Sequence, residues 1–126
     1  KMRSFFNWVH GGYRNPVEGP GFADNPNFGK VLEVFHQDDN IDLVVIELSV
    51  QQLHENQDLQ KDRVQAIKNF QLTSTKPCVV ILTSTFPVGD TALVTPMIKE
   101  FDAEGVIAFP TFERGARALN HIVEQH

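Results

Sequence analysis

The chain has 126 residues, of which 41% are hydrophobic and 21% are charged, and this size predicts a single domain around one core. Its one cysteine excludes an internal disulfide framework and a multi-cysteine zinc site, and fits a reducing cytoplasm. A net charge of −5 without a run of Lys or Arg argues against a broad basic surface for nucleic acid or an anionic membrane. No apolar stretch approaches the roughly 20 residues of a membrane helix.

The first 25 residues are expected to differ from the rest of the chain. Arg3–Val9 is apolar enough for an edge strand, the glycines that follow predict irregular chain, and a short first strand is expected at Asn15–Glu18. Because the chain begins with Lys rather than Met, we expect a piece cut from a longer protein. Phe5, Phe6 and Trp8 would then form an exposed patch able to drive dimerisation of the fragment.

From residue 26 the chain alternates between helical spacing and short apolar runs. Asn25 and Pro26 are a typical N-cap and first-turn pair, and the predicted helix ends at Asp38-Asp39-Asn40. Leu43–Leu48 then forms a continuous apolar run with one acid, Glu47. Such a run predicts a strand that is covered on both faces.

A second helix is expected at Asp58–Phe70 and a second buried strand at Cys78–Leu82, separated by the break at Lys76-Pro77. The residues predicted to face inward from this helix are Val64, Ile67 and Phe70, and those predicted to face outward are Lys61, Asp62, Arg63 and Lys68.

A third helix is predicted after Asp90, with a kink or a restart at Pro96 and an end at Gly105. Val106–Phe109 reads as a third strand, and Thr111 as the cap of the last helix. The apolar positions predicted to face inward from that helix are Ala116, Leu119, Ile122 and Val123.

This alternation predicts an α/β fold, a three-layer, open parallel sheet of four to five strands of the flavodoxin-like type. The expected organisation is a single domain, with an irregular segment at 1–25 and the α/β unit at 26–126.

Several short motifs follow one another from Asn15 to the C-terminus. They are Asn15-Pro16-Val17-Glu18, Asn40-Ile41-Asp42-Leu43-Val44-Val45-Ile46, Lys76-Pro77-Cys78-Val79-Val80 and Gly105-Val106-Ile107-Ala108-Phe109-Pro110-Thr111-Phe112-Glu113-Arg114-Gly115-Ala116-Arg117-Ala118-Leu119. In this order they resemble the succinyl-CoA-synthetase-like ligase domain of NDP-forming acyl-CoA synthetases. The resemblance implies a domain of an acid–thiol ligase, whose parent enzyme interconverts acyl-CoA, NDP and phosphate with a carboxylic acid, CoA and NTP.

The resemblance also implies partners, because the parent enzyme needs parts that this sequence lacks. The chain has no glycine-rich dinucleotide or phosphate loop and is too short for an ATP-grasp unit. CoA and ATP or ADP with Mg would therefore bind elsewhere in the parent enzyme, and no cofactor is expected here. His10-Gly11-Gly12 is interpreted as irregular chain rather than as a phosphohistidine loop. The implied role is a cytoplasmic companion domain that contacts other domains or subunits of the ligase and has no turnover alone.

Two alternatives stay open. Similar ligase-like domains fused to acetyltransferases would act as regulatory sensors of small molecules, and a free-standing flavin or nucleotide binder would belong to a different class. Ligands of an open parallel sheet bind at the carboxyl ends of its strands. The loops expected there are Glu18–Phe22, Glu47–Leu53, Thr83–Asp90 and Pro110–Arg114.

Within these loops the candidate cofactor-binding or domain-contact residues are Glu47, Ser49, Thr83, Ser84, Thr85 and Asp90. The hydroxyl groups after the second strand either cradle a phosphate or satisfy the backbone of a turn. Glu47 either points into the crevice or is a partnered structural acid.

The remaining polar residues give weaker signals. The histidines, His36, His54, His121 and His126, have no spacing that predicts a metal site. Cys78 is expected to be inert, and Asp38, Asp39 and Asp42 lie at the wrong end of the sheet for a phosphoacceptor. Arg114 and Arg117 are expected either to pair with Glu113 and Glu124 or to contact a neighbouring domain.

Overall fold

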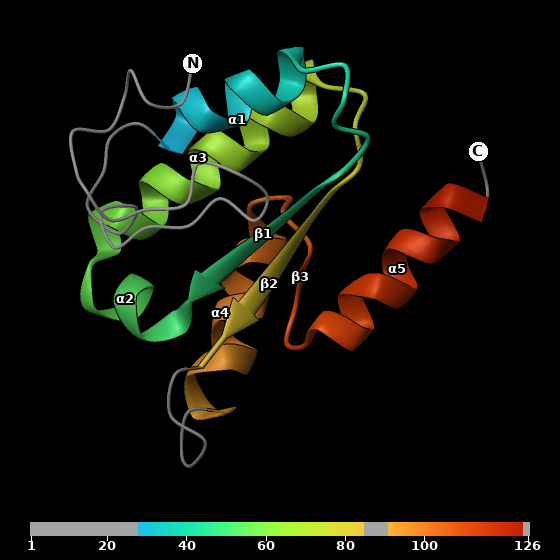
Figure 1. Cartoon of the computed structure of the whole chain (residues 1–126). Coiled ribbons are helices and arrows are strands. Elements are labelled where there is room, and N and C mark those ends of the chain that lie inside the picture. The colour runs from blue at the N-terminus through green and yellow to red at the C-terminus, as the bar shows by residue number, and fades with distance from the viewer. Residues whose placement is uncertain (1–27, 85–90, 125–126) are drawn as a thin grey trace, which may run out of the picture.

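A three-stranded parallel sheet organises the chain in the computed structural model, which describes residues 28–84 and 91–124 (Figure 1). The elements in chain order are α1 (Phe28–Gln37), β1 (Val44–Ser49), α2 (Val50–Glu55), α3 (Gln57–Thr73), β2 (Cys78–Thr83), α4 (Thr91–Ala103), β3 (Ala108–Phe109) and α5 (Phe112–Glu124). The α/β class is therefore confirmed, with three strands in the described ranges. The strands expected at 3–9 and 15–18, the cap at 25–26 and the aromatic patch at 5–8 lie outside the described residues.

The sheet has the strand order β1-β2-β3, with every neighbouring pair parallel. Val44 lies opposite Cys78 and Ser49 opposite Thr83, so β1 and β2 end at the same level. Figure 1 shows α1, α2 and α3 on one side of the sheet and α5 on the other. No helix in the described part of the chain is long and apolar enough to cross a membrane.

The main core lies between the sheet and the helices that connect its strands. Its sheet side consists of Val44, Ile46 and Leu48 from β1, Val80 and Leu82 from β2, and Ala108 from β3. Ile67 of α3 and Phe101 of α4 are fully shielded from solvent against this surface. Burying an aromatic side chain of this size contributes on the order of 2–3 kcal/mol, so this layer provides much of the driving force for folding.

The opposite face of β2 is covered by α5 at close range. Val79 and Ile81 are buried on this face, and Gly115 of α5 lies directly over them. A Cβ atom at Gly115 would collide with Cδ1 of Ile81 and lie 3.2 Å from Cγ1 of Val79. The absence of a side chain at Gly115 thus sets how closely α5 approaches the sheet.

The described residues do not meet the prediction that the first strand is covered on both faces. Buried and exposed side chains alternate along β1: Val45 is 44% exposed, and Glu47 is exposed as well. The reason is the position of α5, which contacts β2 and β3 and leaves the outward side of β1 open.

The helical region after β1 contains two helices where one was predicted. A short helix, α2, precedes α3 and buries Val50 and Leu53, and Asn56 caps α3 by accepting a hydrogen bond from the Leu59 amide at 3.0 Å. The inward positions Val64, Ile67 and Phe70 are confirmed.

Arg63 was expected to face outward but is buried, with 2% of its area exposed. Its guanidinium carbon lies 4.4 Å from the ring centroid of Phe28, and one of its nitrogens is 2.7 Å from the Asp62 carboxylate. The correction follows from α1, which packs on α3 and so covers a second side of that helix.

The last two helices are present as predicted, but some of the bounds and one buried position in this part of the chain differ. Pro96 lies inside a helix that ends at Ala103, followed by Gly105 with a φ of 83°. The third strand is shorter than 106–109. Ala116 is exposed rather than buried, because Gly115 occupies the line that faces the sheet, while Leu119 is half-buried. The side chains of residues 122 and 123 lie outside the described part.

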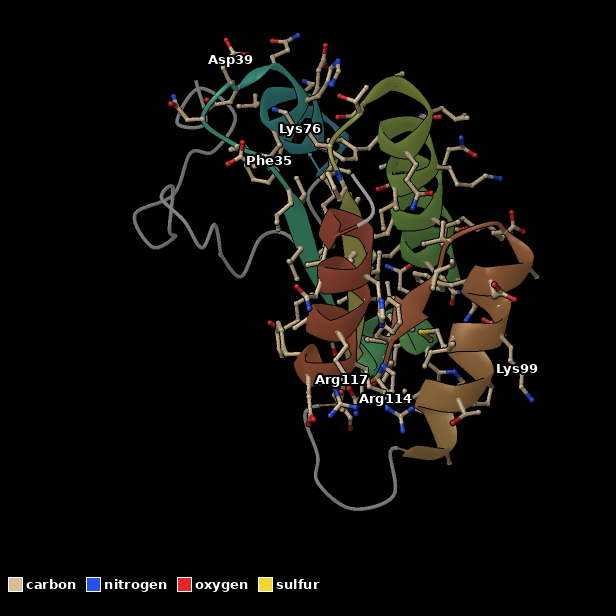
Figure 2. All side chains as sticks on the ribbon, turned by 90° about the vertical axis from the view of Figure 1, so that its right-hand side faces the viewer. Phe35, Asp39, Lys76, Lys99, Arg114 and Arg117 are labelled. Atoms are coloured by element: carbon tan, nitrogen blue, oxygen red, sulfur yellow. The ribbon has the colours of Figure 1, made fainter. Side chains whose placement is uncertain are left out.

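A half-buried lysine contact joins α1 to the segment just before β2. The ammonium group of Lys76 donates hydrogen bonds to the backbone carbonyls of Phe35 and Asp38, the latter at 2.6 Å (Figure 2). These carbonyls lie at the end of α1, where the helix leaves acceptors unpaired and carries partial negative charge. Lys76 therefore fixes α1 relative to the sheet as well as capping it.

We predict that Gly115→Val lowers the free energy of unfolding by roughly 1–3 kcal/mol, because the new side chain overpacks the contact with Val79 and Ile81. The control is Gly29→Ala in α1, where a Cβ would lie 3.9 Å from Ala66, an ordinary contact, and where Ala gains up to about 1 kcal/mol of helix propensity. Urea denaturation of both variants measures the difference. A Gly115→Val protein as stable as the parent chain would contradict the close approach of α5.

We predict that Lys76→Met costs about 1–2 kcal/mol of stability, since it leaves two carbonyls at the end of α1 without their charged donor. Lys99→Met is the matched control, because Lys99 is exposed on α4 and its replacement should change stability by less than about 0.5 kcal/mol (Figure 2). Thermal and urea denaturation compare the two variants, and equal effects would rule out the proposed cap.

Candidate functional site

The carboxyl ends of β1 and β2 bring three of the predicted residues close together. Ser49 and Thr83 are partners in the strand register, and Ser84 follows directly. Because these parallel strands end in register, their last residues lie side by side at the carboxyl edge of the sheet. Open α/β sheets bind ligands at this edge. The prediction that these segments meet is confirmed for the described residues.

The side chains at this edge form a hydrogen-bonded cluster. The Ser49 hydroxyl donates to Oε1 of Gln51 at 3.2 Å, and Nε2 of Gln51 donates to the Ser84 hydroxyl at 2.9 Å. The Thr83 hydroxyl donates to the Leu48 carbonyl at 3.4 Å. We call Ser49, Gln51, Thr83 and Ser84 the edge cluster.

Gln51 is the member of the edge cluster that sequence reasoning missed. It stands at the start of α2, which was itself not predicted, and its amide bridges residues 33 positions apart in the chain. The available signal was its position two residues after Ser49 at the end of a strand. An amide between hydroxyl groups can both donate and accept, so it can join two loops without a charge.

The other predicted site residues do not join this cluster. Glu47 is exposed on the outward side of β1, as its alternation with Ile46 and Leu48 requires, and it makes no ion pair with another described residue. It is therefore neither part of the edge cluster nor a partnered acid within the described ranges. Thr85 and Asp90 lie outside the described residues.

The start of α5 adds backbone and basic groups near the same end of the sheet. The Thr111 hydroxyl accepts a hydrogen bond from the Arg114 amide at 3.1 Å, which confirms Thr111 as the predicted cap. Arg117 pairs with Glu113 at 2.7 Å across one helical turn, and the Arg114 side chain is exposed (Figure 2). An exposed pair of this kind contributes little to stability, so these arginines serve mainly as surface charge.

The acids before β1 lie at the opposite, amino end of the sheet, as predicted. Asp38 accepts a hydrogen bond from the Asn40 amide at 2.9 Å and so stabilises the turn between α1 and β1. In the ranges 28–84 and 91–124, no three His, Cys, Asp or Glu side chains gather in an arrangement able to hold a metal ion.

The chemistry available at the edge cluster is hydrogen bonding. Hydroxyl and amide groups neither gain nor lose a proton near neutral pH, so these side chains can position a polar partner but cannot act alone as a general acid or base. Their bonds to one another and to the Leu48 carbonyl leave each with a defined orientation.

Comparison with known proteins adds no further constraint: no family model, curated protein or solved structure matches this chain.

The half-buried thiol of Cys78 generates a prediction on the pH dependence of stability. Burial raises the pKa of the Cys78 thiol from 9.0 to about 12. Above pH 9 the thiol ionises in the unfolded chain but not in the folded one, so its contribution to the free energy of unfolding is lost as the pH rises toward 12. The measurement is the free energy of unfolding from urea denaturation at a series of pH values from 8 toward 12. The control is Cys78→Ala, which should lack the part of the pH dependence that comes from the thiol. Rapid alkylation of the native thiol at pH 8 would contradict the prediction.

Proposed function

We propose that this chain is a companion domain of an NDP-forming acyl-CoA synthetase, without the nucleophile, that contacts other domains or subunits through the carboxyl edge of its sheet. The proposal rests on the ordered motifs from Asn15 to the last helix, which resemble the succinyl-CoA-synthetase-like ligase domain. The observation that carries it beyond resemblance is the edge cluster, in which the side chains of Ser49, Gln51 and Ser84 are already hydrogen-bonded to one another.

A pre-bonded cluster suits protein packing better than ligand capture. Gln51 joins the start of α2 to the residue after β2, and so holds the two loops at a fixed distance. A rigid edge loses little conformational entropy when a partner packs on it. The exposed Arg114 at the start of α5 supplies a charged contact of the kind enriched in interfaces.

The proposal includes the finer features of the parent enzyme. The complete sheet would have four to five strands in a flavodoxin-like arrangement, and the protein would reside in the cytoplasm. CoA, and ATP or ADP with Mg, would bind to other domains of the parent enzyme. The chain alone would catalyse no turnover.

One observation favours a second candidate, a small nucleotide or flavin binder. Three hydroxyl side chains meet at the carboxyl edge of the sheet, where open α/β folds bind phosphate groups. A regulatory domain fused to an acetyltransferase is a further alternative and would share the same edge.

A ligand screen separates these functions. Thermal shift and calorimetry with CoA, acetyl-CoA, ADP, ATP, FMN and phosphate are expected to show no binding to the chain alone. Gln51→Ala, which opens the edge cluster, and Glu47→Gln, which leaves it intact, are the matched variants. A ligand that raises the melting temperature of the parent chain and of Glu47→Gln, but not that of Gln51→Ala, would replace the companion role with a binding site.

The gene that encodes this chain distinguishes a ligase from a regulator, through the other segments that it encodes. We expect it to encode an ATP-grasp segment, and the joined segments to convert an acyl-CoA, an NDP and phosphate to a carboxylic acid, CoA and an NTP. An acetyltransferase segment in its place would favour the regulatory alternative.

A further inference from the structure

One side of the sheet carries apolar side chains that the described part of the chain leaves exposed. Alternation along β1 places Val45 and Glu47 on the outward side, and Leu43, just before the strand, is exposed as well. Leu43 is 39% exposed and Val45 is 44% exposed. Figure 2, which views this side, shows β1 beside α5 and uncovered by it. A strand with one open apolar side normally packs against another element.

The neighbouring flank of α5 continues this apolar surface. α5 runs antiparallel to the strands (Figures 1 and 2), and Gly115 faces β2. Because successive residues of a helix are rotated by about 100°, Phe112 and Ala116 lie on the flank of α5 toward β1, and Arg114 lies on the flank toward β3. Phe112 is 53% exposed and Ala116 is exposed. We call Leu43, Val45, Glu47, Phe112 and Ala116 the β1–α5 face.

We propose that the β1–α5 face is the docking site for the aromatic segment Phe5–Val9 of the same chain. Residues 1–27 lie outside the described part and enter the argument by sequence alone. The segment holds two phenylalanines, a tryptophan and a valine within five residues, the highest aromatic density in the sequence. Such a segment gains most by burial, about 25 cal/mol per Å² of apolar surface.

Length and charge both favour this occupant. Eighteen residues separate Val9 from Phe28, the first residue of α1, and can span roughly 60 Å when extended, about twice the diameter of a small domain. Lys1 and Arg3 flank the aromatic residues, and the face they would approach carries the exposed carboxylate of Glu47. Opposite charges at the rim of an apolar contact favour one orientation of the segment over the reverse.

The single tryptophan makes the proposal measurable in the intact chain. Trp8 lies within the segment, so all tryptophan emission reports its surroundings. Docking predicts emission at short wavelength and weak quenching by acrylamide. Val45→Lys and Ala116→Lys, which place a charge on the face, are expected to move the emission to longer wavelength and to raise the quenching constant several-fold. Glu47→Lys should weaken docking by repelling Lys1 and Arg3.

Leu72→Lys is the control, because Leu72 is an exposed apolar residue on α3, with 83% of its area exposed, away from this face. Far-UV circular dichroism and a cooperative melt establish that each variant is folded. If acrylamide quenches Trp8 in the parent chain as strongly as a fully exposed tryptophan, the proposal is overturned. Short-wavelength emission that none of the three face variants changes would overturn it as well. Emission that depends on protein concentration, with a dimer in sedimentation, would replace the intrachain contact with docking between two copies.

Discussion

The structure depends on the enclosure of β2 between two layers. β2 is the central strand, and its four middle residues, Val79 to Leu82, are all buried because the two faces meet different helices. One face belongs to the main core with α3 and α4, and the other lies under α5. The second layer is possible only at close range, since Gly115 provides no Cβ above Val79 and Ile81. The pairing of β1 and β3 with β2 follows from the fixed position of this strand.

Polar groups inside the helical layer determine how α1 sits on this frame. Lys76 holds the carbonyls at the end of α1, and Arg63 of α3 stacks on Phe28 at its start. A short helix of ten residues is marginal by itself in water, so contacts at both of its ends decide whether it forms and where it lies. The asymmetry of the sheet arises in the same way, from helix placement: within the described ranges the connecting helices use one face, and α5 is the helix that reaches β2 from the other.

This asymmetry separates two surfaces with different chemistry. The carboxyl edge is polar and internally hydrogen-bonded through Gln51, as suits a rigid contact for a partner domain. The outward side of β1 exposes Val45, and Leu43 just before the strand is exposed too, as suits contact with a segment rich in aromatic residues. The companion-domain proposal concerns the edge cluster, and the docking of Phe5–Val9 concerns the β1–α5 face, so either can fail without the other.

The sequence by itself determined the α/β class, the positions of β2, α3 and α5, the cap at Thr111 and the meeting of Ser49 with Thr83, because periodicity and strand ends are local signals. It did not predict the burial of Arg63, the open side of β1, the bridging role of Gln51 or the exposure of Ala116. Each of these depends on which helix covers which surface. An apolar run such as Leu43–Leu48 shows that a strand is buried on at least one face, but only the placement of α5 over β2 and β3 decided that no described element covers the other face.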